Sequence, residues 1–225
     1  LKQYPEAAPG VDPTLLNNPQ RYQDEIIQTW RLFFAGHYQR ARNKGLELGY
    51  FGLLPGGLSQ VLYGIYLADR KSVKDMLLQD VLDRTDEYKD VTRRMIDDER
   101  PEVRRMAMFN TLGRVYAMGR IAEEARIPVA VARGYLRKVR ELANQALSVT
   151  PDHPLALALL AGVDSGIMRR VGKFTGRMTY GARTTNVKDA FDKALSKVPD
   201  MAVLQYEYAN SIIYMNRKRE LNTAM

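Results

Sequence analysis

Basic residues and glycines gather in one short stretch, residues 172–186, which reads GKFTGRMTYGARTTN. The pair Gly172-Lys173 invites comparison with a nucleotide-binding P-loop. That motif requires a glycine, four residues, Gly-Lys and then Ser or Thr, in a loop that follows a strand. Here five residues separate Gly166 from Gly172, and Phe174 follows the lysine. The spacing therefore excludes a P-loop.

A second hypothesis for this stretch is binding of an anion or an acidic protein. Its glycines can turn backbone N–H groups inward to form a nest, and a helix expected near Asn186 would present its positive N-terminal end. The residues predicted to contact a partner are Arg169, Arg170, Lys173, Arg177, Tyr180, Arg183 and, on a later helix, Tyr206.

The alternative is a structural role for the same residues. Thr185 or Asn186 would then cap the following helix with a side-chain oxygen. Phe174, Met178 and Tyr180 would pin the loop onto the hairpin that it closes. In this interpretation the stretch first braces a hairpin, and its basic residues are the place to look for a partner.

Other residues offer little chemistry. His37 and His153 each lie in a turn, without a second ligand at metal-binding spacing, so both are expected to face solvent. The acidic run 97–99 lies beside arginines and is expected to be solvated or paired with them. No metal motif, nucleophile elbow or serine–histidine pair is present. We therefore predict a protein that is not an enzyme and that needs no cofactor and no metal.

The composition of the chain limits the kinds of partner that we expect it to bind. The 225 residues include 34 basic and 26 acidic ones, giving a net charge of +8, and no cysteine. The charge favours acidic partners, whereas nucleic acid is not expected, because no dense Lys/Arg tract is interleaved with aromatics. The longest apolar run, 155–163, is far shorter than the roughly 20 residues of a spanning helix, so no transmembrane segment is expected. The absence of cysteine excludes disulfides and thiolate chemistry.

Helical periodicity dominates after an irregular, proline-rich lead-in over residues 1–19. Glycines and prolines fall between the periodic segments, among them the run Pro55-Gly56-Gly57. The sequence therefore predicts an all-α protein. We expect helices over 20–35, 38–49, 57–69, 72–86, 87–98, 102–120, 128–149, 154–171, 186–197 and 201–216.

The helices repeat. Ala-Leu, three residues and Pro-Asp occur at Ala146 and again at Ala194, 48 residues later. Each copy ends one helix and offers an aspartate to cap the next. Between the copies and before them, helices carry small residues and aromatics at helical spacing, as in the segment 108–119, MFNTLGRVYAMG.

This pattern resembles the tetratricopeptide repeat. First-helix positions of that family are matched by Phe109, Leu112, Gly113 and Tyr116. Second-helix positions are matched by Phe191, Ala194 and Pro199. A further second helix is matched by Ala146 and Pro151, although Ala143 stands where an aromatic is usual. The resemblance implies a right-handed α-solenoid of about five antiparallel hairpins, in one TPR-like domain over residues 20–225.

Two hairpins of this solenoid have enlarged tips. The 48-residue spacing exceeds the roughly 34 residues of a standard repeat by about 14, and the extra length falls in 172–186. The preceding first helix is expected to run past Gly119 toward Ile127. First helices of the family line a concave groove, so the resemblance also implies that Tyr206, Tyr208 and Tyr214 include groove residues.

A weaker resemblance joins the tip Thr179–Ala182, the segment Phe191–Leu195 and the helix Tyr206–Asn210. Together they look like bacterial envelope repeat proteins related to the T-component of tripartite periplasmic transporters. This implies a periplasmic or cell-envelope location, the alternative being cytoplasmic. Because the chain begins at Leu1 without methionine, we expect that a preceding segment has been removed.

The functional prediction is a non-catalytic scaffold that binds a protein segment through its concave face and basic hairpin tips. The alternative is a protein that binds a small, partly apolar ligand in an envelope transport system.

Overall fold

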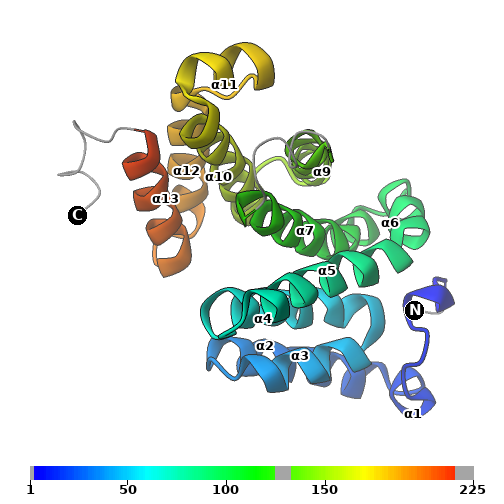
Figure 1. Ribbon diagram of the computed structural model, residues 1–225. Coiled ribbons are helices and arrows are strands. Elements are labelled where there is room, and N and C mark those ends of the chain that lie inside the picture. The colour runs from blue at the N-terminus through cyan, green and yellow to red at the C-terminus, as the bar shows by residue number, and fades with distance from the viewer. Residues whose placement is uncertain (1–2, 125–132, 216–225) are drawn as a thin grey trace. The chain divides into compact units, whose positions relative to one another are not determined.

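The computed structural model describes residues 3–124 and 133–215, and over these ranges it is helical and contains no strand (Figure 1). The all-α prediction is confirmed. Before the gap the helices are α1 (Pro13–Leu16), α2 (Pro19–Phe34), α3 (Tyr38–Glu47), α4 (Leu53–Tyr66), α5 (Lys71–Glu87), α6 (Lys89–Ile96) and α7 (Pro101–Glu124). After the gap they are α9 (Tyr135–Val149), α10 (Pro154–Val171), α11 (Lys173–Tyr180), α12 (Thr184–Lys197) and α13 (Ala202–Met215).

The chain divides into two compact units, which we call unit 1 (Leu1–Ile121) and unit 2 (Ala122–Met225). That one array continues through both units stays a prediction. The lead-in belongs to unit 1 and contains a 3-10 turn, Pro5–Ala7, as well as α1. Ala7 and Val11 are buried in the core of the unit, so the lead-in is packed and locally helical, with an irregular chain only between these turns.

Helix starts in unit 1 follow local chemistry. α2 begins with Pro19, and the Asn18 side chain accepts a hydrogen bond from the backbone N–H of Arg21 at 3.1 Å. The prediction for α4 was wrong at its start. Pro55 lies in the first turn of this helix, where a missing N–H costs little, so α4 begins at Leu53 and not after the Pro-Gly-Gly run.

Glycines bring α3 and α4 into close contact. A Cβ atom on Gly45 would lie 2.7 Å from the carbonyl oxygen of Gly52 and 2.8 Å from Cα of Gly56. All three glycines are buried, and α3, the 3-10 turn Gly49–Gly52 and α4 pack here without side chains between their backbones. Backbone contact at this distance is open only to glycine.

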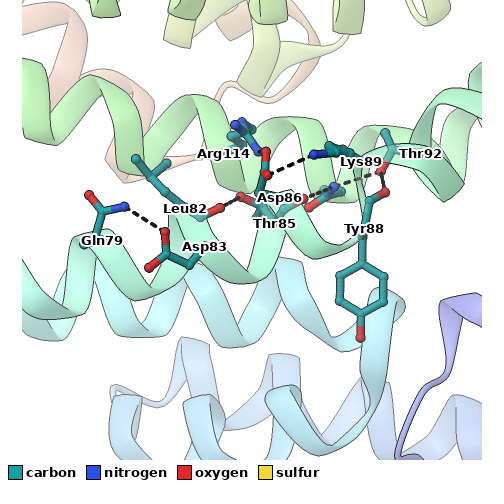
Figure 2. Close-up of polar contacts among 10 residues, drawn as sticks. Gln79, Leu82, Asp83, Thr85, Asp86, Tyr88, Lys89, Thr92 and Arg114 are labelled. Atoms are coloured by element: carbon teal, nitrogen blue, oxygen red, sulfur yellow. Dashed lines mark hydrogen bonds and ion pairs between the residues drawn. The ribbon is translucent and has the colours of Figure 1, made fainter. Parts of the chain in front are cut away.

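A buried polar network joins α5, α6 and α7. The Asn110 amide donates to the Thr85 carbonyl at 2.9 Å and to the Thr92 hydroxyl at 2.8 Å. Beside this network, at the surface, Arg114 contacts the carboxylate of Asp86 at 2.8 Å. Lys89 approaches the same carboxylate (Figure 2). Buried donors are satisfied by neighbouring helices, so the network sets the register between them.

The described helices that lie wholly in unit 2 are α9, α10, α11, α12 and α13. α10 contacts α9, α12 and α13, and α12 also contacts α13. Phe191, Val187 and Ile167 are fully buried between these helices, and Tyr208 stacks on Phe191 with ring centroids 4.9 Å apart. The aromatic predicted at a second-helix position, Phe191, therefore fills the interior of the unit.

The predicted stretching of the first helix before the gap is confirmed as far as the description reaches. α7 continues past Gly119 to Glu124. The rest of the predicted extension, toward Ile127, lies outside the described residues, as does the predicted start of the next helix at residue 128. After the gap, α9 begins at Tyr135, behind Gly134 in the left-handed region.

Candidate functional site at the α11 tip

The predicted loop over 172–186 contains a helix. α11 occupies residues 173–180 and sits at the end of α10 (Figure 1). Gly172, with φ of +84°, and Gly181, with φ of +69°, form the corners on either side. The expectation of an open loop was wrong because the glycines bracket a helix, with only Gly176 inside it.

The backbone groups of this segment are used within it. The N–H of Gly181 donates to the Arg177 carbonyl at 3.1 Å, and the N–H of Ala182 donates to the Gly176 carbonyl at 3.1 Å. The N–H of Gly172 donates to the Met168 carbonyl at 3.0 Å. These are the bonds of helix ends, so these three N–H groups are not open to a ligand. Anion binding at the tip stays a prediction.

One face of α11 packs on α10. Gly176 is buried, and a Cβ atom placed on it would lie 3.2 Å from Cγ of Met168. Tyr180 packs against the core of unit 2, as expected of a bracing residue. Because Gly176 has no side chain, the helix lies close against α10, and its opposite face is turned to solvent.

The outer face presents the residues that were expected to pin the loop. The side chain of Phe174 is 80% exposed and that of Met178 is 70% exposed. They are four residues apart and therefore lie on one side of the helix. The bracing role predicted for these two was wrong. Sequence alone could not show which side of the segment would carry Gly176 toward the core.

The helix cap predicted after the tip was also wrong. α12 begins at Thr184, so Thr185 and Asn186 lie inside its first turn. The residue at the cap position, Arg183, makes no side-chain hydrogen bond to the helix. The hydroxyl of Thr184 is directed at the sulfur of Met168, at 3.8 Å.

The predicted basic residues separate into two groups. The guanidinium of Arg169 lies over the ring of Tyr214, 4.2 Å from its centroid, and Arg170 donates to the Ala122 carbonyl at 2.6 Å. Arg169 therefore joins α10 to α13, and Arg170 joins α10 to the last turn of α7. Arg177 and Arg183 are exposed at the tip. Lys173 is exposed as well and has a polar contact of its own.

The tyrosines of α13 also have different surroundings. Tyr208 belongs to the core through its stacking on Phe191, and Tyr214 lies beneath Arg169. Tyr206 is exposed and remains a candidate for contact with a partner. The three tyrosines that the repeat resemblance grouped as groove candidates therefore do not act as a set.

A buried carboxylate beneath the tip was missed by sequence reasoning. Asp164 of α10 is buried, and Arg140 of α9 places Nη1 3.4 Å from its Oδ1. The same Nη1 donates a hydrogen bond to the carbonyl of Tyr180, at the end of α11. Arg140 thus ties α9, α10 and α11 together. The available signal was one acidic residue inside the apolar run ALALLAGVDSGIM.

The electrostatics of this pair are dominated by burial. Burial raises the pKa of Asp164 to about 6, and the charge and hydrogen bonding of Arg140 oppose that rise. Close by, the hydroxyls of Ser165 and Ser211 lie 3.0 Å apart and join α10 to α13. A raised carboxyl pKa is common in catalytic sites. The described contacts of Asp164 and Arg140, however, join helices, so we interpret the two residues as a structural pair.

The other candidates from the sequence were the two histidines and the acidic run 97–99. His37 is exposed as expected, but His153 is half-buried, and burial lowers its pKa, so the prediction for His153 was wrong. Asp98 is paired as expected. Hydrogen bonds from Arg100 and Tyr4 hold its pKa well below the usual range.

Two wider findings concern metals and membranes. Within residues 3–124 and 133–215, no group of three His, Asp or Glu side chains is placed to hold a metal ion. In the same ranges, none of the helices has both the length and the apolar character to cross a bilayer.

Comparisons with known proteins give no relative for this chain. No family model matches the sequence, and searches of curated proteins and of solved structures found no match either.

Proposed function

We propose that this protein is a non-catalytic scaffold that binds an acidic, partly apolar protein segment at the α11 tip. The observation that carries the proposal is the outer face of α11. Phe174 and Met178 are largely exposed, one turn apart, beside the exposed Arg177. Exposed apolar side chains next to arginine are typical of the residues that contribute most to protein–protein binding.

The way in which α11 is fixed to unit 2 supports a role of its outer face in recognition. A two-turn helix with glycine corners and a tie from Arg140 holds its outer side chains in a defined arrangement. Less conformational entropy is then lost on binding than with a free loop. The net charge of +8 would speed association with an acidic partner. Arg183 and Tyr206 are the further candidates for contact.

The packing within each unit supports a TPR-like array. In unit 2, α10 contacts both its partner α12 and the next first helix, α13, and in unit 1 α2 contacts α3 and α4 in the same manner. Stacked hairpins bury their faces on their neighbours in this way. A right-handed solenoid is the arrangement we propose for these hairpins, and a periplasmic or envelope location stays a prediction from resemblance. Binding of a small, partly apolar ligand stays a prediction too.

The test is site-specific photo-crosslinking. A photoreactive phenylalanine analogue at position 174 is expected to give an adduct with a particular protein, whereas the same analogue at Met76, 61% exposed on α5, gives none. Arg177→Glu combined with Arg183→Glu is expected to reduce the adduct at least about tenfold, because two attractive charges become repulsive. The control is Arg93→Glu, an exposed arginine of α6. Equal adducts at positions 174 and 76 would refute the proposal.

A further inference from the structure

A cluster of aromatic side chains lies where α2 ends and α3 begins. The rings of Trp30 and Phe34 stack with centroids 5.8 Å apart, and Phe33 meets Phe34 edge-on at 5.2 Å. Phe33 also contacts Tyr38, at 5.9 Å. Phe34 is 74% exposed, and Ile27, two turns earlier on α2, is exposed as well. These rings pack on one another at the surface of unit 1.

The end of α4 extends this surface. The amide of Gln39, in the first turn of α3, donates to the hydroxyl of Tyr63 at 3.1 Å. This contact places the last turn of α4 beside the α2–α3 turn, and Figure 1 shows both at one end of unit 1. Tyr66 and Leu67 are exposed there. We call this surface the aromatic end; it consists of Ile27, Trp30, Phe33, Phe34, Tyr38, Tyr66 and Leu67.

The charge around the aromatic end is positive. No acidic residue occurs in the sequence between Glu25 and Glu47. Of the basic residues in that stretch, Arg31 and Arg40 are exposed. Arg70 is exposed in the turn after Leu67, beside the one acidic residue of that turn, Asp69.

We propose that the aromatic end inserts into the headgroup region of a membrane that contains anionic lipid. Trp, Tyr and Phe side chains favour the boundary between headgroups and acyl chains, and arginines beside them are attracted to anionic lipids. The rings of Trp30 and Phe33 are half-buried, and both contact the ring of Phe34, which projects into solvent. A fluid headgroup layer accepts such a projection without a complementary pocket.

This inference is independent of the proposed function. It concerns unit 1, whereas the partner site lies in unit 2. It also requires no spanning helix, because the end would lie on one leaflet. A protein partner at the same surface is the competing outcome, and the experiment is designed to separate the two.

The chain carries its own reporter, because Trp30 is its only tryptophan. With vesicles of equal parts phosphatidylglycerol and phosphatidylcholine in about 0.1 M salt, Trp30 emission is expected to shift to shorter wavelength. Lipids brominated on their acyl chains are expected to quench it. Vesicles of phosphatidylcholine alone are expected to bind at least about tenfold more weakly, because the arginines then have no anionic lipid to attract them. An unchanged emission spectrum with the anionic vesicles overturns the proposal.

Variants locate the contact. Phe34→Ser is expected to weaken vesicle binding about tenfold, since a largely exposed ring no longer enters the apolar boundary. Phe174→Ser removes an equally exposed ring from unit 2 and is expected to leave binding unchanged. Arg31→Gln combined with Arg40→Gln is expected to lower the affinity for anionic vesicles at least about tenfold. All these side chains are exposed, so unchanged melting temperatures are expected and would show that the fold is retained.

Each possible result either supports or overturns membrane insertion. Loss with Phe34→Ser and retention with Phe174→Ser support insertion at the aromatic end. Equal losses with both variants, or equal binding to neutral vesicles, overturn it. A crosslinked protein from a photoreactive phenylalanine analogue placed at position 34, without any binding to vesicles, also overturns it. That result would assign this surface to a protein partner.

Discussion

Gly45→Ala is expected to lower the free energy of unfolding of unit 1 by about 2 kcal/mol, although alanine is the better helix former. The new methyl group would meet backbone atoms of Gly52 and Gly56 at 2.7 and 2.8 Å. A flexible side chain could move aside, but here α3 and the start of α4 must separate. Contacts across that helix pair would then be lost together.

The measurement is urea unfolding followed by the fluorescence of Trp30, which lies in α2 of the same unit. The matched control is Gly113→Ala in α7, where no described atom lies within 4 Å of the added Cβ. That variant is expected to be about 0.5–1 kcal/mol more stable than the natural chain, because only the helix propensity changes. A stabilised Gly45→Ala variant would show that α3 and α4 are not in backbone contact.

Asp164→Asn is expected to remove a pH dependence of stability worth about 2–3 kcal/mol. The folded-state pKa of Asp164, about 6, lies above the ordinary aspartate value of 3.8 that applies in the unfolded chain. Below pH 3.8 the carboxyl is protonated in both states and the folded state carries no penalty. Between pH 3.8 and 6 the unfolded chain releases the proton first, so stability falls as pH rises, and above pH 6 the loss is complete.

The quantity to measure is the difference in unfolding free energy between the Asn variant and the natural chain, from pH 4 to pH 7.5. Circular dichroism is a suitable readout because unit 2 contains no tryptophan. His153, whose lowered pKa acts in the opposite direction, is shared by both proteins and cancels. The difference is expected to rise with pH. A flat or falling difference would mean that Arg140 stabilises the carboxylate at least as much as burial disfavours it.

Much of the fold was open to prediction because it rests on local chemistry. Proline in the first turn of α2 and of α10 indicates where those helices begin, and both starts are correct within a residue. The same rule failed at α4, where Pro55 is equally acceptable in a first turn but was taken as a break. α11 was missed for a related reason. Glycine is typical both of loops and of the corners around a short helix, and the sequence does not distinguish them.

The site was less open to prediction because it depends on which side of each helix faces the core. Exposure of Arg177 and Arg183 agrees with their sequence context. The outward position of Phe174 depends instead on the burial of Gly176 against α10. The Asp164–Arg140 pair joins residues 24 positions apart on different helices, and one-sequence reasoning has no means of pairing them.

Between the glycine corners at 172 and 181, the exposed side chains of α11 are different residues from those that fix the helix in place. Its anchoring is done by backbone bonds, by Gly176 and by the tie from Arg140, none of which involves the outer side chains. Positions 174, 177 and 178 can therefore change in sequence with little effect on folding. Under the proposed function, these outer positions could be exchanged, by natural variation or by design, to change the partner while the core of unit 2 stays the same.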